Sequence, residues 1–584
     1  MKNFLKTLLA VLVGLLISNL LVFWIVSAFV SAAGKQTPPV AREGVLKVDL
    51  SKIVLAEQST ETFNFNSDSR TTVGLLKAVA AVEAAALDPG VKCIYLKPDG
   101  ASMGLGTIVE FREALKHFRE SGKPIIAYTE NPTTGSYYLA SVADKVYMGS
   151  YQGGSPMLTG VSSQMMFLGD ALAKLGVNVQ LIRHGKYKSA GEMYIRSSAS
   201  KENLHQNQVM IDSIWEALSE EMAAARGISV KDLNAAIDNL QLCLPVDFLN
   251  AGLVDELFDR KELEDKLAVM AQVESYDKVS YIPFADYAQS RIYGNIRSPK
   301  SIAIVYANGS IVDGYDVQNV DGDRFASILE EIRDNESVKV VILRVNSPGG
   351  SVMASEKIRH ELDRLAEVKP VIASYGDYAA SGGYWISNGA EKIYADPTTL
   401  TGSIGVFSMI PDLSKLYKET LHIGVESVKS NKHSDMLGLT RPLSPAELAY
   451  MQRSVENIYT RFVSLVSESR DLTYAQVDEI AQGRVWAGSD AINIGLVDEL
   501  GGLRDAINYA AALGGDEAPA NWNIVEYPRE LTLIELLTEQ LTGTVNDYSV
   551  YSNFANYYKR WFDSWQQGPQ EFTFATMPYI PSFR

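Results

Sequence analysis

The feature that most constrains this chain of 584 residues is an internal duplication. The hexapeptide GLVDEL occurs at Gly252–Leu257 and again at Gly495–Leu500. The stretch YYLASVADKVY, which begins at Tyr137, matches YWISNGAEKIY, which begins at Tyr384, with the tyrosines at both ends in register. Because the two separations along the chain are nearly equal, we expect two homologous units. A single hydrophobic core does not grow to this length, which agrees with a repeated unit.

The second copy predicts alternating strands and helices. Val338–Asn346 is an almost continuous run of apolar residues, as in a strand covered on both faces, and it ends at the turn SPGG. A segment with helical spacing follows at 354–367, and two further strand-like runs lie at 370–376 and 391–396. Strands separated by helices imply crossover connections, so the sequence predicts an α/β fold with parallel sheets.

One long helix is predicted near the end of the second copy. Ser444 and Glu447 have the spacing of a capping box, and Pro445 stands at the first helical position. Apolar residues then recur at spacings of three and four, at Leu448, Met451, Val455, Ile458, Phe462 and Leu465. A stripe of this kind typically packs against a core or a subunit.

The turns and changes in composition suggest the following division of the chain. We place the first repeat at 45–285, a polar linker at 286–300, the second repeat at 301–515, and an aromatic-rich C-terminal extension at 516–584. The extension could pack on a partner, on a membrane surface or on its own domain.

The N-terminal region contains no charged residue from Thr7 to Gly34. This length is sufficient for a membrane-spanning helix, and we interpret 7–33 as an uncleaved signal anchor, with 1–6 in the cytoplasm and 34–44 as a linker. A signal peptide cleaved after Val30–Ala32 is the alternative. Both interpretations place the rest of the chain outside the cytoplasm.

The composition argues against several other functions. The net charge is −17, from 70 acidic and 53 basic residues, which is unsuited to binding nucleic acid. The sequence has no phosphate-binding GxxxxGK[ST] loop and no metal-ligand spacing, so we expect no cofactor. The two cysteines, Cys93 and Cys243, could form a disulfide, but Cys93 lies in an apolar strand-like run and is expected to be a buried free thiol.

Two glycine-rich turns in the second copy are candidates for chemistry. Ser381, in AASGGYW, stands where a strand passes into a helix and is followed by two glycines. The segment Asn346–Ser351, NSPGGS, ends the preceding strand at the same edge of the predicted sheet. A serine beside free glycine amides is a layout for acyl transfer, although both segments could also be simple turns.

A nucleophilic serine needs a base, and the local pattern offers no histidine. A lysine can serve if burial or nearby positive charge lowers its pKa by several units from about 10.4. In the first copy Thr134 takes the place of Ser381, and Asp99–Met103, DGASM, takes the place of the glycine-rich turn. The first copy therefore lacks the serine.

Several motifs in order resemble the signal peptide peptidase A family, also called protease IV, in its long, duplicated, membrane-anchored form. They are LRVNSPGGS, AASGGYW, DPTTLTGSIGV, GRVWAG, GLVDELGG and, in the first repeat, YKSAGE. The resemblance extends from the anchor to about residue 510. It implies two tandem repeats similar to crotonase and to ATP-dependent caseinolytic protease, and catalysis by a Ser/Lys dyad.

The resemblance also assigns site residues. It makes Ser381 the nucleophile, Lys188 the general base and Ser403 the residue that orients the base, with the backbone N–H groups of Gly350 and Gly382 as oxyanion donors. Lys186 stands two residues from Lys188 and remains open on chemical grounds.

Each repeat lacks part of this set. Aligning RHGKYKSA, from Arg183, with KSNKHSDM, from Lys429, places Ser434 opposite Lys188. The second repeat thus has the serine and the first has the lysine, so a site must form where repeats meet, within one chain or between neighbouring subunits.

The resemblance implies a serine endopeptidase of bacterial inner membranes, acting on the periplasmic side on cleaved signal peptides and other short hydrophobic peptides. It also implies a homo-oligomer, with a tetramer favoured, and contact with lipid through 7–33. The alternatives are an inactive scaffold of the same fold, a crotonase-like acyl-CoA enzyme, and a serine hydrolase that uses one of the six histidines.

Overall fold

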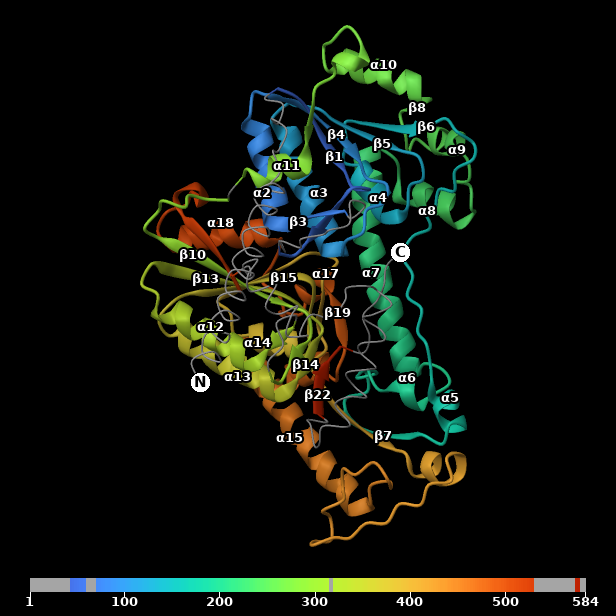
Figure 1. Ribbon diagram of the computed structural model, residues 1–584, viewed down its shortest axis with the longest axis vertical. Coiled ribbons are helices and arrows are strands. Elements are labelled where there is room, and N and C mark those ends of the chain that lie inside the picture. The colour runs from blue at the N-terminus through green and yellow to red at the C-terminus, as the bar shows by residue number, and fades with distance from the viewer. Residues whose placement is uncertain (1–42, 59–69, 292, 315–318, 530–572, 578–584) are drawn as a thin grey trace, which may run out of the picture. The chain divides into compact units, whose positions relative to one another are not determined.

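A computed structural model describes residues 43–58, 70–291, 293–314, 319–529 and 573–577 (Figure 1). The predicted anchor at 7–33 and nearly all of the linker that follows it lie outside these ranges. Within them, no helix combines the length and the apolar character needed to cross a bilayer.

The N-terminal part contains a parallel six-stranded sheet in the order β8-β6-β5-β4-β1-β9. Its strands are β1 (Gly44–Asp49), β4 (Val91–Lys97), β5 (Ile125–Thr129), β6 (Lys145–Gly149), β8 (Glu256–Phe258) and β9 (Tyr281–Pro283). A separate parallel pair consists of β2 (Ile53–Ala56) and β3 (Thr71–Gly74). Both cysteines are free thiols, with Cys93 buried in β4 and Cys243 exposed, so the expectation of a buried thiol at Cys93 is confirmed.

The C-terminal part repeats this strand order. Its strands are β10 (Ser301–Asn308), β13 (Val338–Ser347), β15 (Val371–Ala380), β16 (Lys392–Ala395), β17 (Leu400–Gly402), β19 (Val485–Ala487), β20 (Glu499–Leu500) and β21 (Asn523–Tyr527). The series β20-β16-β15-β13-β10-β21 is parallel and matches the first sheet strand for strand. The strand β15 then forks, because its last residues pair with β17 instead of β16. This fork brings Ser381 and Ser403 to neighbouring strand ends.

The predicted α/β class with parallel sheets is confirmed, and β13 shows why the sequence revealed it. Val341 and Leu343 enter the core cluster on one face of the sheet, and Val340 and Ile342 enter the cluster on the other face. Both faces are covered by helices, with α13 and α14 packed on one side and α18 on the other (Figure 1). A strand buried on both faces has no polar side to alternate with.

Helices connect these strands in both parts. The N-terminal part contains α2 (Leu75–Leu87), α3 (Leu105–Glu120), α4 (Thr134–Ala140), α5 (Gly169–Lys174), α6 (Glu192–Ile195), α7 (Lys201–Arg226), α8 (Val230–Asp238), α9 (Pro245–Asn250), α10 (Arg260–Met270) and α11 (Phe284–Gln289). The C-terminal part contains α12 (Gly322–Asp334), α13 (Val352–Ala366), α14 (Gly382–Ser387), α15 (Pro445–Ser469), α16 (Tyr474–Ile480), α17 (Gly488–Ala491) and α18 (Leu503–Leu513).

The helix predicted after Ser444 is α15. Ser444 caps it by accepting a hydrogen bond from the backbone N–H of Glu447, and the reciprocal bond completes the capping box. The predicted stripe packs on the core, because Met451, Val455 and Phe462 are buried. The core interpretation of this stripe is therefore confirmed.

A third sheet joins the two parts of the chain, in the order β12-β11-β14-β22-β18-β7. Its strands are β7 (Asn178–His184), β11 (Ile311–Val312), β12 (Val320–Asp321), β14 (Gly349–Ser351), β18 (Val406–Asp412) and β22 (Thr573–Thr576). The strand β7 pairs antiparallel with β18 along its whole length. This pairing brings a strand of the first repeat to the edge of the second.

A buried ion-pair cluster forms another joint between the two parts. Arg344, on β13, donates to Glu57 at 2.9 Å through Nε and also bonds the carboxylate of Glu110, on α3. Arg344, Glu57 and Glu110 are all buried. Asp396 is buried in the same charged surroundings, and its Oδ2 atom has no hydrogen-bond partner among the described residues. This cluster therefore contains more carboxylates than the single guanidinium of Arg344 can neutralise.

Candidate active site

Ser381 lies at the junction of β15 and α14, as predicted from the strand-to-helix pattern. Its backbone has φ 56° and ψ −112°, a left-handed φ that non-glycine residues rarely adopt. The surrounding structure holds this conformation, because the N–H of Ser381 donates to the carbonyl of Gly402 at 2.8 Å and its carbonyl accepts from Trp385 at 2.8 Å. Strain of this kind clusters at functional sites, where it fixes a side chain in one direction.

Lys188 reaches this serine from the first repeat. It follows β7 by four residues, and its Nζ donates to Oγ of Ser381 at 2.8 Å. The antiparallel pairing of β7 with β18 places the lysine near Ser403, because β7 ends four residues before Lys188 and β18 begins three residues after Ser403. The two residues that the sequence assigned to different repeats are thus in contact within one chain.

The environment of Lys188 favours a neutral amine. Its side chain is fully buried, and burial lowers its pKa well below the ordinary lysine value. No carboxylate within the described ranges forms an ion pair with it, so no opposite charge there offsets the cost of desolvating the ammonium form. A neutral amine can accept a proton from the serine hydroxyl.

Two glycines make room for the lysine. Gly483 has φ 78°, and a Cβ there would lie 2.5 Å from Cβ of Lys188. A Cβ on Gly405 would lie 3.2 Å from Cδ of the same side chain. The backbone N–H of Tyr187 also donates to the carbonyl of Gln482 at 2.9 Å, which anchors the lysine loop to the second repeat.

Ser403 provides the remaining polar contacts of the amine. Its carbonyl accepts a hydrogen bond from Nζ of Lys188 at 3.0 Å, and its Oγ lies 3.1 Å from the same nitrogen. Like Ser381, it has a positive φ, of 50°, and is fully buried. The amine thus has three oxygen partners, which are Oγ of Ser381 and the carbonyl oxygen and Oγ of Ser403.

The two predicted oxyanion glycines lie in different elements. Gly382 is the first residue of α14, and Gly350 lies in β14. Gly349, which directly precedes Gly350, has φ 96°. A Cβ on Gly349 would lie 2.6 Å from the backbone nitrogen of Gly382. Only glycine permits this approach, which brings the end of the SPGG turn against the start of α14.

The other candidate bases lie elsewhere. Lys186 is exposed, with its Nζ over the ring of Tyr187. All six histidines belong to the described residues, and none of them hydrogen-bonds Ser381 there. His184, the nearest in sequence to the lysine, stacks on Tyr459.

The counterparts in the other repeat have different surroundings. Thr134, which matches Ser381, lies at the start of α4 and donates to the carbonyl of Gly160 at 2.9 Å. Ser434, which the alignment places opposite Lys188, is exposed and donates to the carbonyl of Asn431 at 2.9 Å. Neither makes the polar contacts seen between Lys188 and Ser381.

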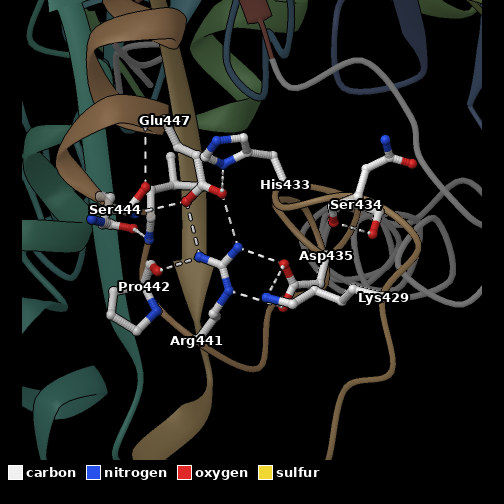
Figure 2. A network of polar contacts seen from close by, with 11 residues as sticks. Lys429, His433, Ser434, Asp435, Arg441, Pro442, Ser444 and Glu447 are labelled. Carbon is white, nitrogen blue, oxygen red and sulfur yellow. Dashed lines mark hydrogen bonds and ion pairs between the residues drawn. The ribbon is translucent and has the colours of Figure 1, made fainter.

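Figure 2 shows the polar network around Ser434. Arg441 bridges two carboxylates, with Nη2 lying 2.6 Å from Asp435 and 2.9 Å from Glu447. Hydrogen bonds from Arg441 hold the pKa values of both carboxyl groups well below their usual range. Because Glu447 also completes the cap of α15, this network fixes the loop that precedes the helix.

Sequence reasoning missed two parts of the site. It quoted the motif that contains Gly483 but gave that glycine no role, because close approach to a residue far away in the chain leaves no local signal. It also did not anticipate β22, whose four residues carry no turn or periodicity signal of their own. Within the described residues no cluster of three or more His, Cys, Asp or Glu is arranged to hold a metal ion.

The model of peptidase family S49 matches residues 117–274 and 363–515, which include Lys188, Ser381 and Ser403. The chain belongs to peptidase family S49. The relationship to the signal peptide peptidase A and protease IV group, predicted from the motifs, is thereby confirmed.

Relatives of this S49 peptidase are similar over most of its length. It is 36% identical to Protease 4 of Haemophilus influenzae over 83% of this chain and 81% of the relative. It is 35% identical to Protease 4 of Salmonella typhi over 88% of this chain and 84% of the relative. It is also 33% identical to the chloroplastic serine protease SPPA of Arabidopsis thaliana, over 77% of this chain and 66% of the relative.

Among solved structures, a point mutant of ClpP1 from Listeria monocytogenes is similar over 35% of this chain and 92% of its own. The identity is 16% and the TM-score 0.24, which is too low to describe the fold of the S49 peptidase. The likeness of its repeats to crotonase and caseinolytic protease therefore stays a prediction.

Proposed function

We propose that this chain is a serine endopeptidase that uses Ser381 as nucleophile and Lys188 as general base. The observation that carries the proposal is the 2.8 Å contact between the buried Nζ of Lys188 and Oγ of Ser381. A buried neutral amine in hydrogen-bond contact with a strained serine is the arrangement that nucleophilic catalysis requires.

In the proposed reaction, Lys188 takes the proton of Ser381 while Oγ attacks the carbonyl carbon of a peptide bond. The backbone N–H groups of Gly350 and Gly382 stabilise the oxyanion of the tetrahedral intermediate. The lysine then gives its proton to the leaving amine as the C–N bond breaks. In the second half, the same amine activates a water molecule that hydrolyses the acyl-enzyme and frees the serine.

Ser403 acts in this proposal as a positioning residue. Its carbonyl and hydroxyl oxygens lie within hydrogen-bond distance of Nζ, and they accept from the ammonium group that forms during attack. They therefore direct the amine toward Ser381 and stabilise its protonated state.

The wider function follows the family resemblance. The proposed substrates are cleaved signal peptides and other short hydrophobic peptides, reached from a bacterial inner membrane to which residues 7–33 anchor the chain. The proposed assembly is a homo-oligomer, with a tetramer favoured. The contact of Lys188 with Ser381 supports a site completed within one chain, so the assembly need not supply the base.

The proposal is tested by the variants Ser381→Ala and Lys188→Ala in the full chain. Each should abolish hydrolysis of a fluorogenic peptide, and the oligomer measured by light scattering should be unchanged. Lys186→Ala serves as the matched control, because this exposed lysine stands two residues from Lys188, and it should retain activity. Full activity of Lys188→Ala would exclude the lysine mechanism.

A serine-directed acylating inhibitor gives an independent test. Mass spectrometry should locate the modification on Ser381 in the wild-type chain and find none in Lys188→Ala, because the base is needed for acylation as well. Modification of another serine would contradict the assignment of the nucleophile.

A further inference from the structure

The lysine loop is the segment 185–191, which connects the end of β7 to the start of α6. Its backbone turns tightly around the base, because the N–H of Ser189 donates to the carbonyl of Tyr187 at 2.8 Å. Loops are more mobile than the elements that they connect. The contact of Lys188 with Ser381 therefore depends on groups that hold the lysine loop in place.

One arginine binds the backbone of the proposed general base directly. Arg183 lies in β7, and its Nη1 donates to the carbonyl of Lys188 at 2.8 Å. The same nitrogen lies 3.1 Å from Oε1 of Glu192, the first residue of α6, which packs on β7 (Figure 1). Arg183 therefore connects the element before the lysine loop, the central residue of the loop and the element after it.

The carboxylate of Glu192 fixes the position of this guanidinium. Glu192 is buried, and its Oε2 accepts hydrogen bonds from the backbone N–H of Ser200 at 3.1 Å and from Nδ2 of Asn203 at 3.3 Å. Among the described residues, Arg183 is the cation that forms an ion pair with it. A buried charge must be paired and hydrogen-bonded, so the loss of either partner leaves the other uncompensated. The two side chains therefore act as a unit.

We propose that Arg183 and Glu192 form a positioning pair, which holds the backbone of Lys188 where its amine reaches Ser381. The inference rests on the proposed function, because it concerns the base of that same reaction. It goes further by giving a role to the glutamate that ends the motif YKSAGE and to the arginine five residues before the lysine. Among the described residues, the amine itself bonds only Ser381 and Ser403, so the positioning pair acts on it through the backbone.

The neighbouring carbonyl of the lysine loop has a separate partner. Nε2 of Gln206, on α7, donates to the carbonyl of Tyr187 at 3.1 Å, and its Oε1 accepts from the N–H of Val485, in β19, at 3.3 Å. Gln206 thus ties the lysine loop to the second repeat, whereas the positioning pair holds it within the first. Hydrogen bonds from a charged donor are stronger than those between neutral groups. We therefore expect the positioning pair to contribute more to the placement of the lysine than Gln206 does.

The first test compares Arg183→Met and Glu192→Gln in the full chain, with a fluorogenic peptide as substrate. The two changes remove charges of opposite sign but release the same loop. Because burial lowers the pKa of Lys188, an amine that is no longer held in place gains water and a higher pKa. In both variants the rise of kcat/KM should therefore move to higher pH. The value of kcat at pH 7 should fall by about 10–100-fold, with KM little changed.

A conservative variant and a matched control accompany this test. One nitrogen of Arg183 makes both contacts, and the ammonium group of a lysine also has donors for two acceptors, so Arg183→Lys should recover part of the lost kcat. Arg226→Met is the matched control, because Arg226 likewise donates to a backbone carbonyl, that of Gly252, and to a carboxylate, that of Asp255. The control should keep the pH profile of the wild type.

Hydrogen–deuterium exchange tests the positioning without catalysis. In chains that carry Ser381→Ala, the backbone amides of 185–191 should exchange about tenfold faster when Arg183→Met is also present, because fewer contacts then hold the lysine loop. Arg226→Met in the same background should leave the exchange of this segment unchanged. This readout does not depend on the dyad.

The outcomes separate the two proposals. If no chain hydrolyses any peptide but the faster exchange is found, the proposed function fails and the positioning pair stands. If the enzyme is active but Arg183→Met and Glu192→Gln keep the kcat and the pH profile of the wild type, the positioning pair is refuted. Shifts of the two pH profiles in opposite directions would also refute it, because the two side chains would then act on Lys188 through their charges alone.

Discussion

Nζ of Lys188 lies 2.8 Å from Oγ of Ser381, although 193 residues separate them in the chain. The lysine belongs to the first repeat and the serine to the second, and each repeat lacks the partner residue at the matching position. Each copy therefore holds one of the two groups in this contact. The two copies then depend on each other, because neither contains both groups.

The proposed mechanism predicts how the rate depends on pH. The protonated amine cannot accept a proton from Ser381, so kcat/KM should rise with pH as Lys188 loses its proton and then level off. Because burial lowers the pKa of Lys188 well below the ordinary lysine value, the plateau should be reached well below a pH of about 10.4. The measurement is kcat/KM for a fluorogenic peptide from pH 5 to 10. A rate that rises only near the ordinary lysine pKa would contradict a buried neutral base.

The same burial predicts a stabilising substitution. The unfolded chain holds a proton on Lys188 that the folded chain releases, so folding is penalised at every pH below the unfolded lysine pKa. Lys188→Met has a similar shape and no proton to lose, and it should raise the free energy of unfolding at pH 7 by about 1–2 kcal/mol while it abolishes hydrolysis.

Denaturant unfolding at two pH values checks this reasoning. The gain from Lys188→Met should shrink as the pH approaches the unfolded lysine pKa, because the wild type then loses its penalty. Lys186→Met, at the exposed lysine, is the control and should leave stability unchanged. A destabilised Lys188→Met at pH 7 would show that the amine contributes more through its hydrogen bonds than it costs by burial.

The sequence predicted those elements whose signal depends on residues that are neighbours in the chain. The strand predicted at Val338–Asn346 is Val338–Ser347 in the structure, and the helix predicted after Ser444 begins at Pro445. Both were found because apolar patterning and capping depend on neighbours in the chain. Lys188 was assigned through the family resemblance alone, since nothing in its local sequence indicates that β7 pairs with β18.

The third sheet was not predicted for the same reason. The strands β7, β14 and β22 come from three distant segments, and β14 and β22 have only three and four residues, so pairing partners decide their conformation. The close approach of Gly483 to Lys188 is likewise a tertiary contact. The parts of the site that the motifs missed are thus those made by contacts between distant segments.

Removal of the Ser403 hydroxyl should weaken catalysis without abolishing it. In Ser403→Ala the amine keeps the carbonyl of residue 403 at 3.0 Å but loses Oγ at 3.1 Å. We expect kcat to fall by roughly 10–100-fold, as for residues that orient a reacting group through a hydrogen bond. The lost acceptor stabilised the protonated amine, so the rise of kcat/KM should also move to lower pH. A fall in kcat without this shift would assign Ser403 a purely structural role.

Gly483→Ala should inactivate the enzyme although Gly483 is neither member of the Ser381–Lys188 pair. The new Cβ would lie 2.5 Å from Cβ of Lys188 and 2.7 Å from its Cα, at a backbone φ of 78° that alanine rarely adopts. The lysine loop must move, and a displacement of about 1 Å at a reacting group can cost on the order of 100-fold in rate. Gly389→Ala is the matched control, because no atom in the described part of the chain lies within 4 Å of its added Cβ. Equal activity of the two variants would show that the lysine loop tolerates the displacement.

The carboxylates around Arg344 predict the sign of a pH effect on stability. Burial and the neighbouring Glu110 raise the pKa of Asp396 well above its ordinary value, so between the unfolded and folded pKa values the folded chain holds a proton that the unfolded chain releases. Stability from this group is present at acid pH and is lost as the pH rises. Asp396→Asn needs no proton and should raise the free energy of unfolding at pH 8 by about 1–3 kcal/mol, with little effect near pH 4.

Asp435 provides a contrast of opposite sign. Its hydrogen bonds with Arg441, shown in Figure 2, lower its pKa, so Asp435→Asn should destabilise the chain equally at every pH above the ordinary aspartate pKa of about 3.9, and this effect should be lost only in stronger acid. Urea unfolding of the two variants and the wild type at pH 4.5, 6 and 8 distinguishes the two environments. Equal destabilisation by Asp396→Asn at all three pH values would mean that its carboxylate is charged and neutralised by Arg344. The buried cluster around Arg344 would then be an ordinary ion-pair cluster, and its carboxyl groups would not hold a proton.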